Sequence, residues 1–292
     1  MSSDLATVYL EPDQVDIADP VLVIALDGWV DAGFGMRHAA EIMVKGHDER
    51  PVASFDADLL IDHRARRPTM TVRDGRVDDI SWPAIQLQVV SDLDQREFLI
   101  LRGPEPDFRW QAFCTAVDDL VQQLGVARTV SIGAYPAAVP HTRPVRLSAT
   151  GTSPELIERF GAPQGTLEVP AGISAVLAKR FEASGMETVS VWAQVPHYAA
   201  GSPFPAGTAA LFQGLRAAAD LRFDPAPLIA EGLEVSRRLD TMIAQNASHQ
   251  RLLSQLESAY DTAVGEQGNE IPSGDELAEE LERFLRDQDE SK

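Results

Sequence analysis

The most prominent hydrophobic run of the chain is Val21–Leu26, which stops abruptly at Asp27-Gly28. Six apolar residues without polar alternation, too few for a helix of ordinary length, are typical of a strand that is buried on both faces. A Gly-rich turn follows, and Met36–Lys45 has the composition of a helix. Strand, turn and helix in this order predict the opening of a doubly wound α/β sheet, in which ligands bind beyond the carboxyl ends of the strands.

Similar runs of apolar and β-branched residues, bounded by Gly, Pro or Asp, predict further strands. The expected strands are Thr7–Leu10, Val21–Leu26, Val52–Phe55, Ile85–Val90, Phe98–Leu101, Thr129–Ile132, Val145–Ser148 and Val189–Ala193. The expected helices are Phe34–Lys45, Asp107–Leu124, Pro154–Phe160, Gly172–Ser184 and Ala206–Leu221. Because strands and helices alternate, the predicted fold class is α/β, a three-layer α/β/α sandwich with a mostly parallel sheet. This core domain is assigned to residues 1–222.

The pattern changes after residue 222, where no strand signal remains. Apolar residues from Val235 to Tyr260 recur at alternating spacings of four and three, the pattern of a helix–helix seam. The inner positions of this seam are Leu239, Met242, Asn246, His249, Leu253 and Leu256. We predict a helical extension over residues 223–264 that packs on the core or lies at a subunit interface, with the two polar positions setting its register. Residues 265–292 are predicted to be a flexible acidic tail with a short helix.

The amino-acid composition limits which partners and which cellular compartment we expect. A net charge of −20 argues against nucleic acid, because binding phosphates requires clustered Lys and Arg. No apolar stretch approaches the length of a membrane span, and residues 1–20 hold acids but no basic residue, which does not fit a signal peptide. The single Cys114 cannot form an internal disulfide and is expected to be a buried, inert thiol. We therefore expect a cytoplasmic protein with no membrane and no nucleic-acid partner.

The known catalytic motifs are incomplete in this sequence. Gly33-Phe-Gly35 lacks the third Gly of a dinucleotide-binding turn, and no Gly-Lys-Ser/Thr follows it. Gly172-Ile-Ser-Ala-Val176 lacks the closing Gly of a nucleophile elbow. No two His residues have the spacing that places two metal ligands on one helical face. We therefore assign no catalytic residue, no metal and no cofactor.

Several polar residues nevertheless follow predicted strands or concentrate positive charge. The candidates for a pocket or an interface are Asp27, Trp29, Asp31, Arg64, Arg67, Tyr135, His141, Arg143 and His197. One interpretation is a composite anion pocket built from Arg64, Arg67, His141 and Arg143. The other is that the arginines pair with the many acids of the chain and shape an interface.

Five segments of the sequence resemble the proteasome assembly chaperone 2 family, in particular its actinobacterial branch of uncharacterised cytoplasmic proteins. They are Leu26-Asp-Gly-Trp-Val-Asp-Ala-Gly33, Asp62-His-Arg-Ala-Arg-Arg-Pro68, Gly133-Ala-Tyr-Pro136, Pro170-Ala-Gly-Ile173 and Pro196-His-Tyr198. The similarity covers roughly residues 5–260 in matching order. It implies an α/β/α fold of the phosphorylase/hydrolase-like type and a homo-oligomer, with a trimer as the expected closed form.

The resemblance also implies a function, since eukaryotic and archaeal members are chaperones of proteasome assembly without an established reaction. Some bind the proteasome core through a C-terminal hydrophobic–Tyr–any-residue motif. The sequence here ends Asp289-Glu-Ser-Lys292, so docking through that motif is not expected. The leading hypothesis is a non-catalytic interaction protein with proteasome components as partners. The alternative is a hydrolase or transferase with a small-molecule pocket at the carboxyl ends of the strands.

Overall fold

The computed structural model describes residues 5–10, 15, 17–45, 50–163 and 165–268. The described residues up to Asp240 form one compact unit, and those from Thr241 form a second. The division therefore lies inside one helix, and the domain boundaries predicted after residues 222 and 264 remain predictions. The short helix predicted within residues 269–292 lies outside the described residues.

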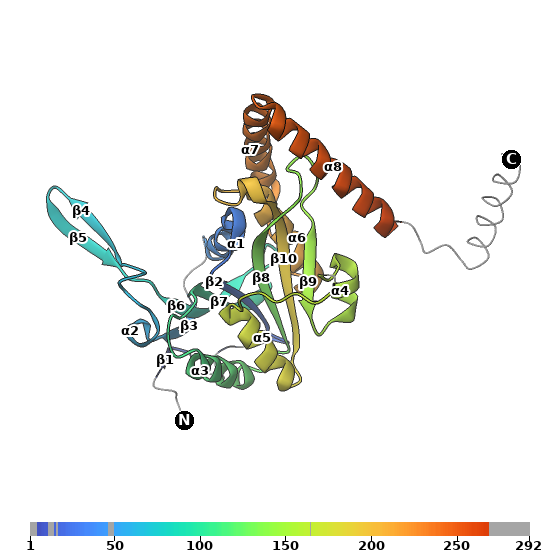
Figure 1. The fold of residues 1–292 in the computed structure, drawn as a ribbon. Coiled ribbons are helices and arrows are strands. Elements are labelled where there is room, and N and C mark those ends of the chain that lie inside the picture. The colour runs from blue at the N-terminus through green and yellow to red at the C-terminus, as the bar shows by residue number, and fades with distance from the viewer. Residues whose placement is uncertain (1–4, 11–14, 16, 46–49, 164, 269–292) are drawn as a thin grey trace, which may run out of the picture. The chain divides into compact units, whose positions relative to one another are not determined.

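An eight-stranded sheet forms the centre of the first unit (Figure 1). Its strands, in spatial order, are β1 (Ala6–Val8), β3 (Arg50–Phe55), β6 (Ile85–Ser91), β7 (Glu97–Pro104), β2 (Val21–Asp27), β8 (Arg128–Ala137), β10 (Glu187–Pro196) and β9 (Leu147–Gly151). The four strands from β7 to β10 run parallel, and the flanking pairs are antiparallel. The parallel centre carries the apolar runs that predicted it, because it is covered on both faces.

Helices cover both faces of this sheet. Those of the first unit are α1 (Gly35–Val44), α2 (Ala57–Leu60), α3 (Trp110–Gln123), α4 (Pro154–Phe160), α5 (Ile173–Ala183), α6 (Pro205–Ala219) and α7 (Ala226–Ala244), the last of which continues into the second unit. Short 3-10 turns, η2 (Ala32–Phe34) and η3 (His197–Ala199), follow β2 and β10. The predicted α/β/α sandwich with a mostly parallel sheet is confirmed. No described helix has both the length and the apolar composition needed to cross a membrane.

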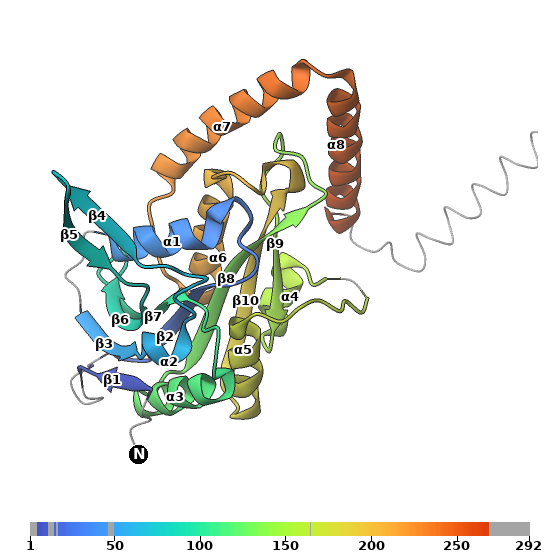
Figure 2. The same ribbon diagram turned by 60° about the vertical axis from the view of Figure 1, so that its left-hand side comes forward.

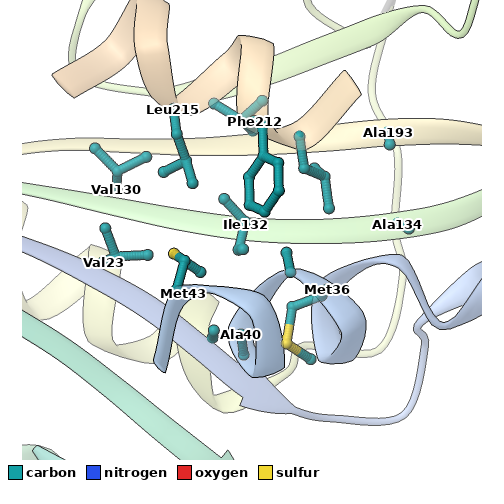
Figure 3. Packing of buried hydrophobic residues seen from close by; sticks show 14 of the residues in the cluster. Val23, Met36, Ala40, Met43, Val130, Ile132, Ala134, Ala193, Phe212 and Leu215 are labelled. Atoms are coloured by element: carbon teal, nitrogen blue, oxygen red, sulfur yellow. The ribbon is translucent and has the colours of Figure 1, made fainter. Parts of the chain in front are cut away.

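Strand β2 shows how the sequence builds two cores. Its alternate residues point to opposite faces, so Val21 and Val23 join one cluster while Leu22 and Ile24 join the other. The first cluster is formed with α1 and α6, where Met36 and other α1 side chains meet residues of β8, β10 and α6 (Figure 3). The second cluster is formed with α3 and α5. At about 25 cal/mol per Å² of apolar surface removed from water, these two layers supply the main stabilisation of the fold.

Three elements between Phe55 and Ile85 were not predicted. No element was expected between Phe55 and Ile85, yet α2 lies there, and β4 (Thr69–Arg73) pairs with β5 (Arg76–Ser81) in a separate two-stranded sheet. The hairpin closes at Asp74 and Gly75, whose φ angles of 50° and 77° suit an Asp-Gly turn. Every residue of both strands is exposed, so the segment has no buried run for a hydrophobic pattern to reveal.

The predicted seam divides into two helices, α7 and α8 (Ala247–Gly268). Asn246 lies between them, and its Oδ1 accepts a hydrogen bond of 2.8 Å from the backbone N–H of Ser248, as the residue before a helix commonly does. Within the first unit, Leu228 and Leu239 of α7 are buried in the α1–α6 core cluster. The start of the extension therefore packs on the core. A role of Met242, His249, Leu253 and Leu256 at an interface remains a prediction.

Candidate functional site

The polar candidates lie in loops that leave one edge of the sheet. β2, β7, β8 and β10 run parallel and end at Asp27, Pro104, Ala137 and Pro196, so their following loops meet at the same edge. The structure places the candidates in four small groups along these loops and in the segment after α2.

The first group surrounds the start of α1. The Asp31 carboxylate accepts hydrogen bonds from the backbone N–H of Met36 at 2.8 Å and of Arg37 at 3.0 Å. The Arg37 guanidinium pairs with Asp27 at 2.7 Å. Burial raises the pKa of Asp31 above its ordinary value, and the two backbone hydrogen bonds offset part of this rise. Both aspartates therefore fix the turn between β2 and α1, where Asp31 satisfies N–H groups that a helix start leaves free.

The second group surrounds the start of α5 and includes Glu105, which was not among the predicted site residues. Glu105 is buried, and its Oε2 accepts a hydrogen bond of 3.0 Å from the backbone N–H of Ile173. Gly172 precedes the helix and has no side chain that could cap it, so Glu105 takes over this role from a distant loop. The indole of Trp29 lies against Gly172. A Cβ atom added at Gly172 would lie 3.8 Å from the Cδ1 atom of Trp29. Trp29 is 56% exposed.

The segment after α2 carries the predicted cation cluster, and Arg66 is the residue that anchors it. Arg66 Nη1 donates to the carbonyl oxygen of Glu105 at 2.9 Å, and Nη2 lies 3.4 Å from Asp107. Arg64 and Arg67 are exposed, and neither guanidinium has an ion pair or a hydrogen bond among the described residues. The segment therefore presents Arg64 and Arg67 at the surface, while Arg66 fixes the segment to the loop after β7.

The third group joins the loop after β8 to η3 and α7 through His141. The side chain of His141 is fully buried; its Nδ1 lies 2.8 Å from the Tyr198 hydroxyl, and its Nε2 lies 3.1 Å from the Asp240 carboxylate. The backbone N–H of His141 also donates to the Tyr198 oxygen at 2.9 Å. His197 contacts the same tyrosine ring edge-on. Three segments far apart in the sequence are thereby joined at one buried imidazole.

The fourth group lies on the sheet itself. The Tyr135 hydroxyl is 3.4 Å from Ser148 Oγ, and its ring meets Trp192 edge-on with centroids 6.3 Å apart. Gly133 pairs with Trp192 on the neighbouring strand and leaves room for its indole, since a Cβ at Gly133 would lie 2.4 Å from Cζ3. This group therefore depends on a glycine in the middle of a central strand.

Glu105 links three of these groups, because its backbone N–H donates to the Asp27 carbonyl oxygen at 3.0 Å and its own carbonyl oxygen accepts from Arg66. Arg143 lies in the His141 loop, and its Nη1 donates to the carbonyl oxygen of Thr142 at 3.4 Å. The loop bearing Arg64 and Arg67 is anchored on the segment after β7, whereas His141 is anchored on η3 and α7. The composite anion pocket and the alternative interface thus both remain predictions. Asp240 lies 99 residues from His141, so no local sequence signal indicated this partner.

Two surface cavities lie outside the polar clusters, although the first borders the start of α5. A cavity of about 450 Å³ between α3 and α5 is lined by Gln111, Cys114, Ala171, Ala175, Val176, Lys179 and Arg180, and one of about 260 Å³ lies near Phe212 and Arg222. Burial raises the pKa of the Cys114 thiol to about 11, which keeps it protonated and unreactive at neutral pH. Among the described residues, no group of three or more His, Cys, Asp or Glu could hold a metal ion.

The chain is similar to several solved structures from actinobacteria. A Corynebacterium glutamicum protein of unknown function is 33% identical and has a TM-score of 0.83, with 89% of this chain and 98% of that chain covered. Rv2714 of Mycobacterium tuberculosis, also of unknown function, is 34% identical with a TM-score of 0.81 and 90% of each chain covered. A search of curated proteins gave no match.

A third similar structure is described by a function. Rv2125 of Mycobacterium tuberculosis, called a proteasome-assembly chaperone homologue, is 29% identical with a TM-score of 0.72, and 81% of this chain and 99% of that chain are covered. The sequence profile of the PAC2 family matches residues 25–243, which include every group described above. The chain therefore belongs to the PAC2 family.

Proposed function

We propose that this protein is a non-catalytic interaction protein that takes part in proteasome assembly or regulation in the cytoplasm. The observation that carries the proposal is the similarity, over 81% of the chain, to a protein described as a proteasome-assembly chaperone homologue. Its partners are proteasome components and further copies of itself.

The geometry of the sheet edge supports this proposal. Asp27, Asp31 and Glu105 bind an arginine and backbone N–H groups of the chain itself. Their hydrogen-bonding capacity is used to fix turns and helix starts, which is a structural task. What remains at the surface near them is the exposed indole of Trp29, a side-chain type that is enriched at protein interfaces.

A hydrolase or transferase is the second candidate, and one observation favours it. The Tyr198 hydroxyl, the His141 imidazole and the Asp240 carboxylate form a hydrogen-bonded row, the arrangement in which an imidazole can take a proton from a hydroxyl. If the protein is instead a non-catalytic interaction protein, this row is a structural link that joins η3, the loop after β8 and α7. Replacing His141 with Gln separates the two roles, because an enzyme would lose its base while a glutamine can keep one hydrogen bond.

The proposed assembly is a homo-oligomer, with a trimer as its closed form. Residues of the predicted seam and the exposed Arg64 and Arg67 are the candidate contacts, since an acidic surface needs apolar area and cations to associate. A few hundred Å² of buried apolar surface per subunit, at about 25 cal/mol per Å², is enough to oppose charge repulsion at physiological salt.

The test is direct binding to purified proteasome subunits of Mycobacterium tuberculosis. The full-length chain is immobilised, and the α subunits, the β subunits and the assembled core particle are passed over it in turn. The expected result is saturable binding of at least one of these, at physiological salt. An unrelated protein of similar size and net charge is the control, because a chain with a charge of −20 attracts basic proteins without specificity.

A different set of results would favour the enzyme candidate. If none of the three preparations binds above the control, and a small-molecule screen gives a ligand whose binding the His141→Gln variant abolishes, the enzyme candidate replaces the interaction protein. Binding that is unchanged in His141→Gln supports the structural role of this residue.

A further inference from the structure

Helices α3 and α5 lie side by side on one face of the sheet (Figures 1 and 2). An ion pair joins them, in which Arg180 Nε donates to Asp118 Oδ2 at 2.9 Å. The other oxygen of the Asp118 carboxylate accepts from Gln122 Nε2 at 3.1 Å. Between the two helices lies the cavity of about 450 Å³, a volume within the range of small-molecule sites.

The cavity has an uncharged part, where the side chains of the two helices are short. Ala175 and Val176 of α5 and Cys114 of α3 line it, together with Ala171, which precedes α5. The Cys114 thiol is buried and stays protonated, because burial raises its pKa to about 11. A protonated thiol behaves as a small apolar group, so this part of the lining is suited to the apolar body of a ligand.

The charged part of the lining is cationic. Lys179 and Arg180 belong to the lining, and no carboxylate of the described residues does. Asp118 and Glu182 pair with these two cations from outside the lining. In a chain with 45 acidic and 25 basic residues, a cavity lined by cations alone is suited to an anionic ligand.

The two cations have hydrogen-bonding capacity to offer such a ligand. Only Nε of Arg180 is bonded to Asp118, and its two terminal nitrogens have no hydrogen-bond partner among the described residues. Terminal guanidinium N–H groups bind a carboxylate strongly, because both partners are charged and their planar shapes match. The Lys179 ammonium pairs with Glu182 at the surface, where an ion pair is worth little and a ligand can replace it.

We propose that the cavity between α3 and α5 binds a small monocarboxylic acid with an apolar body. The carboxylate lies at Arg180 and Lys179, and the apolar body covers Cys114, Ala175 and Val176. This ligand site goes beyond the proposed function, since it requires neither a proteasome subunit nor a second copy of the chain. Its binding is measured with the small molecule alone, so either claim can fail without the other.

The test is isothermal titration calorimetry of the full-length chain with decanoate as the probe. Decanol is the comparison ligand, because it has the same apolar chain and a neutral head group. The expected result is saturable one-to-one binding of decanoate, at least tenfold tighter than the binding of decanol. The absence of saturable decanoate binding, or equal affinity for decanol, overturns the proposal.

Two variants locate the bound molecule, with circular dichroism to confirm that each is folded. Ala175→Phe fills the cavity and should weaken decanoate binding at least tenfold. Its matched control is Ala183→Phe, the same change at an exposed alanine of α5 outside the lining. Lys179→Gln should weaken decanoate binding at least threefold and leave decanol binding unchanged, with Lys45→Gln, at an exposed lysine after α1, as its control.

The proposal predicts wild-type affinity in both control variants. Decanoate binding of wild-type affinity in Ala175→Phe would show that the probe binds elsewhere and overturn the site. Lys179→Gln keeps the test decisive if Ala175→Phe does not fold, and equal weakening of decanoate and decanol binding in it would overturn the assigned place of the carboxylate.

Discussion

At the scale of single residues, Gly133 decides whether the Trp192 indole fits over β8. A Cβ at this position would come within 2.4 Å of the indole, and β8 lies between two parallel neighbours that limit its movement. We expect Gly133→Ala to lower the free energy of unfolding by about 1–3 kcal/mol, as overpacked cores do. Urea unfolding measures this loss. Gly201→Ala, with nothing within 4 Å of its Cβ, is the matched control, and equal stability of the two variants would contradict the steric role of Gly133.

Asp31 gives the fold a pH dependence whose sign follows from its raised pKa. The folded state binds the Asp31 proton more tightly than the unfolded state, so this residue's contribution to stability falls as pH rises through the folded pKa. Asp31→Asn removes the ionisation. The difference in unfolding free energy, variant minus wild type, should therefore increase between pH 3.5 and pH 7 (about the range in which a raised carboxyl titrates).

Urea unfolding of both proteins across this pH range measures the effect. Asp119→Asn is a suitable control, because Asp119 is exposed on α3. A difference for Asp31→Asn that stays constant with pH, or that decreases, would show that burial does not dominate the Asp31 environment.

At the scale of elements, His141 connects the loop after β8 to η3 and to α7. Its side chain is fully buried and spans the Tyr198 hydroxyl and the Asp240 carboxylate. His141→Ala leaves both partners without this link, and we expect a loss of about 1–3 kcal/mol in unfolding free energy. Hydrogen exchange should also become faster in residues 138–146 and in α7. His249→Ala, at an exposed position of α8, is the control, and unchanged exchange in both variants would exclude the linking role.

The sequence predicted those elements whose burial leaves a regular pattern. The runs at Val21–Leu26 and Phe98–Leu101 became β2 and β7, with ends displaced by a few residues because strand ends carry polar side chains. The β4–β5 hairpin was missed because no residue of its two strands is buried. The spacing of the seam continued across Asn246, so it could not reveal that a cap there separates α7 from α8.

The groups at the sheet edge were predictable only in part. Asp27 and Asp31 were found because they directly follow a buried strand. Glu105 and Asp240 were missed as partners, since each contacts a residue 68 or 99 positions away, and such pairings depend on the topology of the fold. Tyr198 lies in one of the five segments that resemble the family, but its contact with His141 could be seen only in the structure.

At the scale of the whole molecule, charge repulsion and the burial of apolar surface have opposite effects on self-association. Like charges on a chain of net −20 repel its copies, and this repulsion weakens as salt increases. Exposed apolar residues such as Met70, Val77 and Leu167 favour association, and their burial is little affected by salt. We therefore expect the oligomer to become tighter between low and physiological salt.

That the chain works as an assembled interaction protein is tested most directly by the mass of the wild type in solution. Light scattering at micromolar concentration and physiological salt should give three times the 31.8 kDa of one chain. A mass near 31.8 kDa at both low and high salt would contradict the proposed assembly.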